Sequence, residues 1–414
     1  MDAEEQATLT RVGEGTPMGA LLRRYWYPIA VGHEVAPGGA RPVRLLGDDL
    51  VLARSTSGAL ALLPERCPHR GASLARGVVG DGTITCPYHG WSFATDGRCV
   101  AMPGEPDDSR RLARGDTRGF HAEELGGLVF AYVGPEPAPL LPRYDLYVWD
   151  DVARDVGRAL IPCNWLQIME NSVDPLHVEA LHGRHLAETR RRAGLSVPTH
   201  YGRRHVRIGF DLFEHGIVKR RVLEGGSEAD DDWRVGHPLV FPVTLRVGAL
   251  GQHRFQIRVP VDDTHTLHWW YGVYRPDDPA SLPRDRRIAA YDVPWRTPDG
   301  GFRDDYVDGG DIMTWVTQGP VADRTRERLV ASDQGIVLLR RLLFEQLARV
   351  ARGDDPMGVQ RDPARNACIE LPQERDKYGG GPDFLRESLE LSHVRFSPLR
   401  AWIEREIVGR RPPS

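Results

Sequence analysis

Hydrophobic and polar residues alternate over short distances in the first third of the chain, after one helical pattern near its start. Between residues 17 and 25, apolar residues recur at i, i+3, i+4 and i+7 behind Pro17, which predicts a short helix. Short apolar runs separated by Gly, Asp and Ser turns then predict strands at 43–46, 50–53, 59–63, 83–85 and 128–133. The proline-dense stretch 134–142 can form neither a helix nor a central strand. It marks a boundary between a domain at 1–140 and a domain at 141–414.

The second domain mixes longer strands with helices. A helical run is expected from Asn164 through His182. Alternating segments predict strands at 205–213, 217–223, 239–247, 255–260 and 266–274. Residues 275–311 are rich in Pro, Asp and Gly and are expected to form a long loop, and a long helix is expected over 322–352. The pattern predicts an α+β protein whose first domain is all β.

Composition and charge exclude several classes of protein. The 414 residues include 41% hydrophobic and 27% charged residues, and the net charge is −4, so neither a nucleic acid nor a membrane is an expected partner. Residues 1–10 are polar, and no apolar run of about eighteen residues occurs, so no signal peptide or membrane-spanning helix is expected. Three of the five cysteines are widely spaced and odd in number, which argues against a disulfide framework and indicates a cytoplasmic protein.

The most specific chemical pattern is a pair of Cys and His motifs. Cys67-Pro-His69-Arg-Gly and Cys86-Pro-Tyr-His89-Gly-Trp are separated by sixteen residues between His69 and Cys86. Two thiolates and two imidazoles are the ligands of a Rieske [2Fe–2S] cluster, in which neutral histidines replace two thiolates on one iron and raise its potential. A structural zinc site uses the same ligand types, but its motifs are usually Cys-x-x-Cys or His-x₃₋₅-His. The mixed spacing therefore favours the iron–sulfur cluster.

A second metal site is suggested by His177 and His182. Residues five apart diverge by roughly 140° on a regular α-helix, so a π-type turn or a frayed helix end is needed before both can face one metal. The spacing alone leaves ordinary surface or core histidines equally open, and Asp174-Pro175 can simply begin a helix.

A carboxylate ligand is expected from the long helix. Asp333 stands on its apolar stripe, between Leu329 and Val330 on one side and Ile336 and Val337 on the other. Burial of a carboxylate there requires a partner, either a metal or an arginine such as Arg340 or Arg341. Two histidines and one carboxylate form the facial triad of non-haem Fe(II) oxygenases.

Five segments of the chain together resemble the Rieske non-haem iron oxygenases, notably the phthalate-dioxygenase-type branch. They are the entry block T-P-M-G-A-L-L-R-R-Y-W, the blocks C-P-H-R-G-A and C-P-Y-H-G-W, and segments 164–183 and 323–343. The resemblance implies an N-terminal Rieske [2Fe–2S] domain and a C-terminal, helix-grip-like catalytic domain with a mononuclear iron. It implies cluster ligands Cys67, His69, Cys86 and His89 and iron ligands His177, His182 and Asp333.

The resemblance also implies how the two metal centres cooperate. The family forms head-to-tail trimers, some paired as dimers of trimers, in which the cluster of one subunit faces the iron of its neighbour. Asp174 matches the aspartate that bridges a cluster histidine to an iron histidine, and Asn171 matches a position close to the iron. Such a hydrogen-bond acceptor would orient the imidazole and couple the two metals.

The implied activity is that of a terminal oxygenase. It would use O₂ and electrons from NAD(P)H, delivered by a separate flavin and iron–sulfur reductase, because the chain has no nucleotide-binding glycine motif. The product would be a hydroxylated, dihydroxylated or O-demethylated aromatic or heterocyclic carboxylate. A Rieske electron carrier without oxygenase activity and a natural-product tailoring oxygenase are the alternatives.

Substrate contacts are less marked in the sequence. An anionic substrate favours arginine, and Arg207 and Arg246 lie within otherwise apolar predicted strands. Phe241 and Trp270 are candidates for the wall of an aromatic pocket, although core packing is the more frequent role of such residues.

Overall fold

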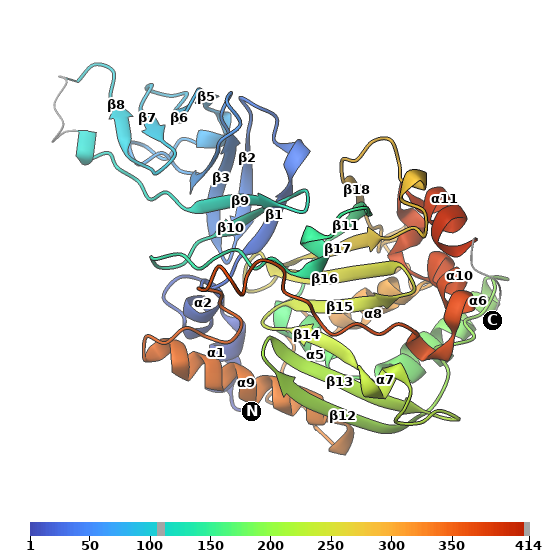
Figure 1. The fold of residues 1–414 in the computed structure, drawn as a ribbon. Helices are drawn as coiled ribbons and strands as arrows, with labels where there is room; N and C mark the ends of the chain where they lie inside the picture. Colours follow the sequence, from blue (N-terminus) through green and yellow to red (C-terminus); the bar gives the residue numbers. More distant parts are fainter. Residues whose placement is uncertain (106–111, 410–414) are drawn as a thin grey trace. The chain divides into compact units, whose positions relative to one another are not determined.

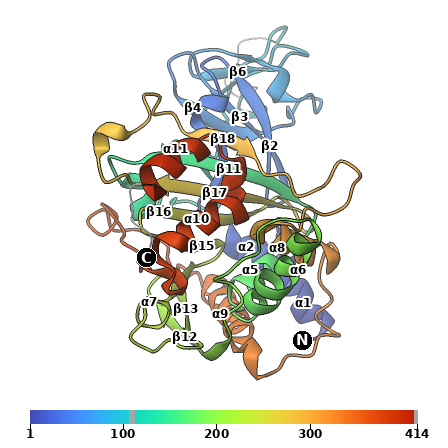
Figure 2. The ribbon, with the colours of Figure 1, turned by 90° about the vertical axis from the view of Figure 1, so that its right-hand side faces the viewer.

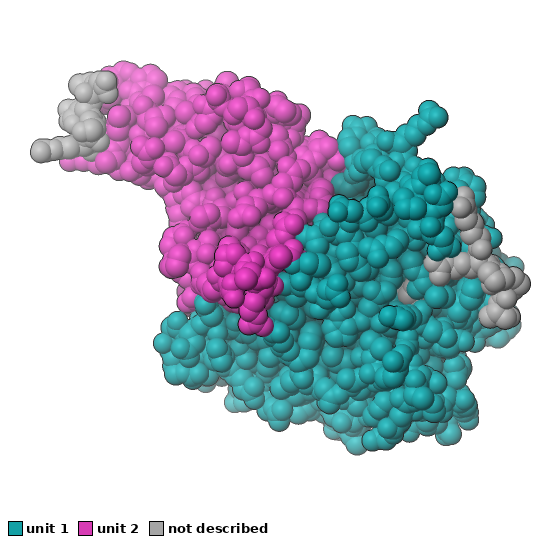
Figure 3. Space-filling model, viewed as in Figure 1, with its two compact units in different colours: residues 1–11, 144–358, 368–414 teal, residues 12–143, 359–367 magenta. Residues whose placement is uncertain are grey.

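The computed structural model describes residues 1–105 and 112–409. The chain divides into two compact units, which are coloured separately in Figure 3. The smaller unit comprises residues 12–143 and 359–367, and the larger unit comprises residues 1–11, 144–358 and 368–414. The boundary at 143/144 is close to the predicted one, but residues 1–11 belong to the larger unit.

The smaller unit is built from three antiparallel sheets (Figure 1). The first has the strand order β1 (Tyr27–Val31), β10 (Leu128–Tyr132), β9 (His121–Leu125), and the second has the order β2 (Ala40–Leu45), β3 (Asp48–Arg54), β4 (Leu60–Pro64). The third consists of β5 (Val78–Val79), β6 (Thr83–Thr85), β7 (Ser92–Ala94) and β8 (Cys99–Ala101). The predicted entry helix is α2 (Pro17–Leu22), in which Thr16 caps the first turn by accepting a hydrogen bond from the Gly19 amide.

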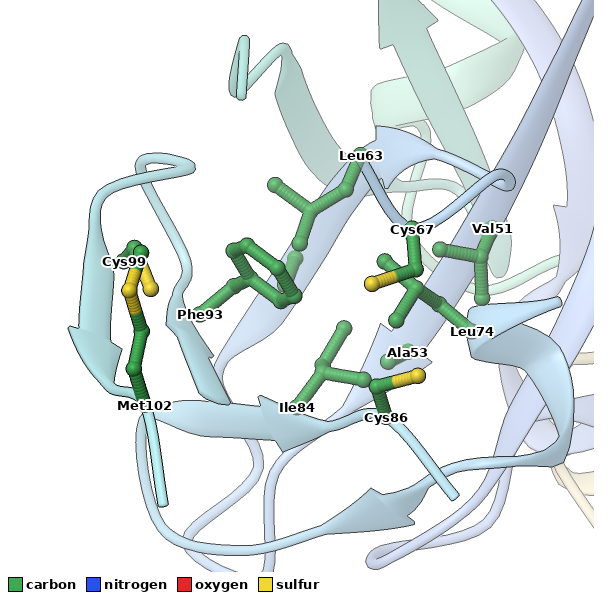
Figure 4. Close-up of a cluster of buried hydrophobic side chains, with 11 residues drawn as sticks. Val51, Ala53, Leu63, Cys67, Leu74, Ile84, Cys86, Phe93, Cys99 and Met102 are labelled. Atoms are coloured by element: carbon green, nitrogen blue, oxygen red, sulfur yellow. The ribbon is translucent and has the colours of Figure 1, made fainter. Parts of the chain in front are cut away.

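A buried apolar cluster fills the space between β3, β4 and the small four-stranded sheet (Figure 4). Val51, Leu63, Ile84 and Phe93 are at most 1% exposed, because alternate residues of each short strand point inward. The cluster also contains Cys67, Cys86 and Cys99.

The larger unit is organised around one eight-stranded sheet. Its strand order is β12 (His205–Phe213), β13 (Gly216–Leu223), β14 (His237–Val240), β15 (Thr244–Ala249), β16 (Gln252–Pro260), β17 (Thr266–Tyr274), β11 (Ala153–Ile161), β18 (Ala289–Asp292). All neighbours are antiparallel except β11 and β18, which are parallel. The predicted strand over 239–247 is two strands, because the turn at 241–243 contains Pro242, which has no amide to donate to a ladder.

Helices complete the larger unit. They are α1 (Ala3–Thr10), α4 (Asp145–Val148), α5 (Trp165–Ser172), the π-helix η3 (Val178–His185), α6 (Leu186–Arg192), α7 (Asp231–Arg234), α8 (Val307–Thr317), α9 (Gln334–Ala351), α10 (Gly381–Leu391) and α11 (Arg400–Ile403). Helix α5 packs on β16, and α9 packs on α5. Both α6 and α8 contact η3, and Figure 2 shows α5, α6 and α8 beside one another.

The α+β organisation and the all-β first domain are confirmed, but two predicted segments were wrong. The expected loop at 275–311 contains β18 and the first half of α8. The expected helix at 322–352 begins only at Gln334, after the single 3₁₀ turn Ala331–Asp333, because the side chains of 325–331 are exposed and supply no buried stripe.

Candidate metal centres and substrate cavity

The two Cys and His motifs form loops of matching geometry in the smaller unit. The Cys67 carbonyl accepts a hydrogen bond from the Gly71 amide at 2.8 Å, and the Cys86 carbonyl accepts one from the Gly90 amide at 3.1 Å. Both glycines have a φ of +73°, a conformation that side chains disfavour. At Gly90 a Cβ would also lie 3.0 Å from Pro103 Cγ.

The two loops separate sulfur from nitrogen donors. Cys67 and Cys86 are 2% and 3% exposed and belong to the apolar cluster of Figure 4. His69 is exposed and His89 is half-buried, and their ring centroids lie 4.5 Å apart. Burial raises the pKa of the Cys67 thiol, and the amides of His69 and Arg70 offset this by donating to its sulfur. Two buried sulfurs and two outer imidazoles fit a [2Fe–2S] cluster with one iron on each pair.

The second pair of histidines lies on the π-helix η3. His177 is its N-terminal flanking residue, and His182 lies within it. The wider i→i+5 turn brings the two ring centroids to 5.0 Å. The predicted distortion of the helix between these residues is therefore confirmed.

The carboxylate that meets these histidines is Asp311 of α8. Its Oδ1 lies 3.3 Å from His182 Nε2 and 3.8 Å from His177 Nε2. Within the described residues, one ligand atom from each of the three lies within 4.8 Å of the others. Asp311 Oδ1 is buried without a hydrogen-bond partner, which is costly unless another group binds there. The three residues thus fit a facial triad for Fe(II).

The structure does not bring Asp333 to this site, and the prediction for that residue was wrong. Asp333 ends the 3₁₀ turn before α9, where its Oδ2 accepts a hydrogen bond from the Val330 amide at 2.7 Å. Leu329 and Val330 are 39% and 66% exposed, so the expected apolar stripe is absent at this point. Arg340, the proposed alternative partner, pairs with Glu170 and Glu327 instead.

Asp174 and Asn171 lie close to the triad in sequence and in space. Asp174 Oδ1 accepts a hydrogen bond from the Leu176 amide at 2.9 Å, as expected of a turn that starts a helix. Its Oδ2 lies 3.7 Å from His177 Nδ1, which is within ion-pair range but longer than a hydrogen bond. Asn171 lines the cavity described next.

A cavity opens beside His177, His182 and Asp311. It has a volume of about 110 Å³ and is lined by β13 to β16, η3, α8 and α10. Three of its cationic residues, Lys219, Arg254 and Arg258, are at most 7% exposed. Burial lowers the pKa of Lys219 to about 7 and that of Arg258 to about 9.

The predicted substrate residues do not line this cavity. Arg207 is exposed and pairs with Glu228, and Arg246 is buried against Asp145 at 2.7 Å. Phe241 is a buried core residue, and Trp270 donates a hydrogen bond to Asp308 at 2.7 Å. Lys219, Arg254 and Arg258 were not among the predicted substrate residues, although Lys219 and Arg258 are cations within predicted strands.

Known proteins share both the sequence and the fold. The Rieske [2Fe-2S] domain family matches residues 25–114, and the family described as LigXa C-terminal domain like matches residues 305–370. The chain is 36% identical to the 5,5'-dehydrodivanillate O-demethylase oxygenase subunit of Sphingobium sp. (strain NBRC 103272 / SYK-6), over 90% of this chain and 86% of that protein. The chain belongs to the Rieske non-haem iron oxygenases. Within this family it is a terminal oxygenase of the phthalate-type branch.

Other relatives of this Rieske oxygenase support the same family assignment. It is 31% identical to the phthalate 4,5-dioxygenase oxygenase subunit of Pseudomonas putida, over 86% of this chain and 88% of that one. The solved structure of NdmA from Pseudomonas putida CBB5 has the same fold, with a TM-score of 0.59 at 21% identity over 80% of this chain and 92% of that chain. In the described part of this Rieske oxygenase, every helix is too short or too polar to cross a membrane.

Proposed function

We propose that this Rieske oxygenase acts on an aromatic carboxylate, which it hydroxylates, dihydroxylates or O-demethylates. The observation that supports this most directly is the pair of arginines on β16. Arg254 and Arg258 line the cavity and are 7% and 1% exposed, yet neither has a carboxylate of a described residue within 4.0 Å. Asp308 and Asp311 line the same cavity and offset part of the charge on Arg258 without forming an ion pair with it, so a substrate carboxylate would complete the pairing of these buried guanidiniums.

The hydrogen bonds of the two arginines leave room for such a partner. Arg258 donates to the backbone and side-chain oxygens of Gln256 at 2.9 and 2.7 Å, while its Nε is buried and unpaired. Among the described residues, Arg254 makes only long hydrogen bonds, 3.5 Å to His393 and 3.4 Å to Ser388. Both guanidiniums can therefore turn donors toward an anion in the cavity.

Each metal centre has its own protein ligands in this proposal. Cys67, His69, Cys86 and His89 would hold the cluster, and His177, His182 and Asp311 would hold the iron. When both groups are bound, the cluster stores single electrons and the iron activates O₂. The arginines then fix the orientation of the aromatic ring relative to the triad, and this orientation decides which carbon reacts.

The electrons come from NAD(P)H through a separate flavin and iron–sulfur reductase, and the oxygenase acts as a homotrimer or a dimer of trimers. In the trimer, Asp174 connects His177 to a cluster histidine of the adjacent subunit. Its 3.7 Å approach to His177 Nδ1 supports the first half of that connection.

The proteins named above include an O-demethylase and a dioxygenase, and their names denote aromatic acids. A third relative, at 34% identity, is the phenoxybenzoate dioxygenase subunit alpha of Ectopseudomonas oleovorans. An anionic aromatic substrate is common to all three names. They do not agree on the reaction, so the product has to distinguish the alternatives, with formaldehyde marking demethylation and a cis-diol marking dihydroxylation.

Oxygen uptake with a surrogate reductase and NADH tests the proposal. Benzoate, phthalate and methoxybenzoates are compared with their uncharged amides. We expect product-coupled uptake with at least one acid and none with its amide, because the amide cannot pair with Arg254 and Arg258. Equal turnover of acid and amide, or no coupled uptake with any acid, would contradict the carboxylate proposal.

A further inference from the structure

Three arginines line a second cavity, which belongs to the smaller unit. Arg23 and Arg24 directly follow α2, and Arg118 lies shortly before β9. Together with Ala20 and residues 133–135 they line a cavity of about 220 Å³, here called the arginine cavity. None of its lining residues is acidic, and it shares no residue with the cavity beside the iron triad. The arginine cavity is therefore a separate, cationic site.

Arg23 is the most buried of the three, and the fold satisfies it only in part. Its side chain is held in place by Nη2, which donates to Asp48 Oδ1 at 3.0 Å and to the Leu46 carbonyl at 3.3 Å. Its Nη1 is buried and has no hydrogen-bond partner, although the residue is only 9% exposed. A buried donor without an acceptor is costly, so this guanidinium favours an acceptor that the chain does not supply.

Arg24 and Arg118 have still more donors to offer. Arg24 is half-buried, its Nε is buried without a partner, and its side chain forms no hydrogen bond or ion pair with a described residue. Arg118 donates to the Gly134 carbonyl at 2.6 Å, and its guanidinium carbon lies 4.7 Å from the centroid of the Phe120 ring. These contacts hold Arg118 in place but occupy few of the five N–H donors of a guanidinium. Most donors of both side chains are therefore available to a bound anion.

The positive charge of the three guanidiniums is only partly balanced by the protein. Within the described residues, Asp48 is the one carboxylate that lies within 4.0 Å of any of them. Burial raises the pKa of Asp48, whereas the charges of Arg23 and Arg118 both lower it, so these two arginines share one anion. Glu14 also acts on Asp48, but it is exposed and lies beyond ion-pair range of the arginines. Three cations and one carboxylate leave two positive charges, which a dianion would balance.

We propose that the arginine cavity binds a phosphate dianion, as inorganic phosphate or as the phosphate group of a small phosphomonoester. A phosphate group carries a charge of about −1.5 to −2 at pH 7 and has at least three strong acceptor oxygens. Guanidinium forks match these oxygens in bidentate pairs. A carboxylate has half this charge and only two oxygens, so it cannot pair with all three arginines. This inference is independent of the proposed function, because none of these residues belongs to the metal centres or to the catalytic cavity.

Titration calorimetry of the full oxygenase, with both metal centres loaded and at constant ionic strength, tests the assignment. The probes are inorganic phosphate, phenyl phosphate and acetate. We expect the wild type to bind at least one of the two phosphates at one site per chain, at least tenfold more tightly than acetate. The tighter of the two identifies the source of the phosphate group. Arg24→Met and Arg118→Met should each weaken phosphate binding at least tenfold, and Arg24→Lys should restore part of the loss.

Two control variants separate this site from other cations. Arg41→Met removes a positive charge from β2 of the same unit, where Arg41 pairs with Glu34 at 2.9 Å outside the cavity, and should change phosphate affinity less than twofold. Arg254→Met removes a cation from the catalytic cavity and should also leave phosphate binding unchanged. The visible spectrum of the Rieske centre shows that the smaller unit of each variant is folded. Absence of phosphate binding, binding no tighter than that of acetate, or binding that survives in Arg24→Met and Arg118→Met or is lost in Arg254→Met overturns the inference.

Discussion

Asp311 and His182 come from different helices, yet the Asp311 carboxylate lies 3.3 Å from the His182 imidazole. The approach depends on the backbone of α8. A Cβ on Gly310 would lie 3.6 Å from a methyl group of Leu181, so α8 runs directly against η3 at this point. A Cβ on Gly309 would collide with the Arg303 carbonyl. Gly309 therefore allows α8 to begin close to residue 303, whereas a Cβ at 310 would make only an ordinary contact with η3.

This relationship predicts that Asp311 holds the mononuclear iron. Asp311→Asn removes the anionic ligand, and the iron content should fall from three atoms per chain to two, with the Rieske absorption retained. The iron analysis and the visible spectrum of the purified protein measure both quantities.

Asp333→Asn is the matched control for that variant. It makes the same chemical change at the residue that the sequence indicated, but the Asp333 side chain only caps a turn. It should keep three iron atoms per chain. Loss of iron from Asp333→Asn together with its retention in Asp311→Asn would reverse the assignment.

The sequence indicated the two histidines correctly and the carboxylate wrongly, for physical reasons. The His177 to His182 spacing is a local property, and only a π-type turn or a frayed helix end could let both imidazoles face one metal. Asp311 follows two glycines, which are poor helix formers, so the surrounding pattern indicated a loop. The requirement for glycine at 309 is set by Arg303 and can be seen only after folding. One local signal for a helix at this position was available, because the apolar residues Ile312, Trp315 and Val316 recur at helical spacing.

The strands could be predicted from the sequence more readily than the pocket that they form. The bounds of β12 and β17 agree with the predicted segments, since alternation or continuous burial marks a strand locally. The face on which a strand cation lies depends on pairing with other strands. Arg207 and Arg246 looked equivalent to Arg254 and Arg258 in sequence, and the sheet placed only the latter pair in the cavity.

Asp174→Asn should separate metal binding from electron transfer. Asn keeps the acceptor oxygen for the Leu176 amide but removes the charge 3.7 Å from His177 Nδ1. We expect three iron atoms per chain and nearly complete loss of turnover, because the connection between adjacent metal centres is broken. Steady-state oxygen uptake and stopped-flow oxidation of the reduced cluster measure the effect. Turnover at the wild-type rate would refute the bridging role.

Glu170 should be important for stability rather than for chemistry. Its carboxylate accepts hydrogen bonds from Arg324 at 2.9 and 2.7 Å and from Arg340 at 2.7 Å, and its side chain is 10% exposed. Glu170→Gln leaves the buried Arg324 without a counter-charge, so the variant should lose about 3 kcal/mol, or roughly 6–12 °C in Tm.

The matched control for Glu170→Gln is Glu188→Gln on α6. Glu188 also accepts hydrogen bonds from two arginines, Arg191 and Arg192, but all three side chains are exposed. Exposed pairs contribute little to stability because solvent screens them, so calorimetric melting should show a shift of at most a few degrees. Shifts of equal size in the two variants would contradict the role assigned to burial.

Asp155 should make the stability of the larger unit depend on pH. Complete burial raises its pKa to about 6, and hydrogen bonds from Ser397 and Tyr274 only partly offset the effect. A carboxyl group whose pKa is higher in the folded than in the unfolded protein binds more protons when folded. The free energy of unfolding therefore falls as pH rises from about 4 to 6 and is constant above that range.

Asp155→Asn removes this titration. Between pH 5 and pH 7 the wild type should lose about 1.4 kcal/mol relative to Asp155→Asn, which corresponds to a relative fall in Tm of roughly 2–4 °C. The control is Asp231→Asn. Although partial burial opposes ionisation of Asp231, the Arg375 amide and the Arg234 guanidinium hold its pKa below the usual value. Its difference from wild type should therefore be constant over this range. A constant difference for Asp155→Asn as well would show that Asp155 is already ionised at pH 5.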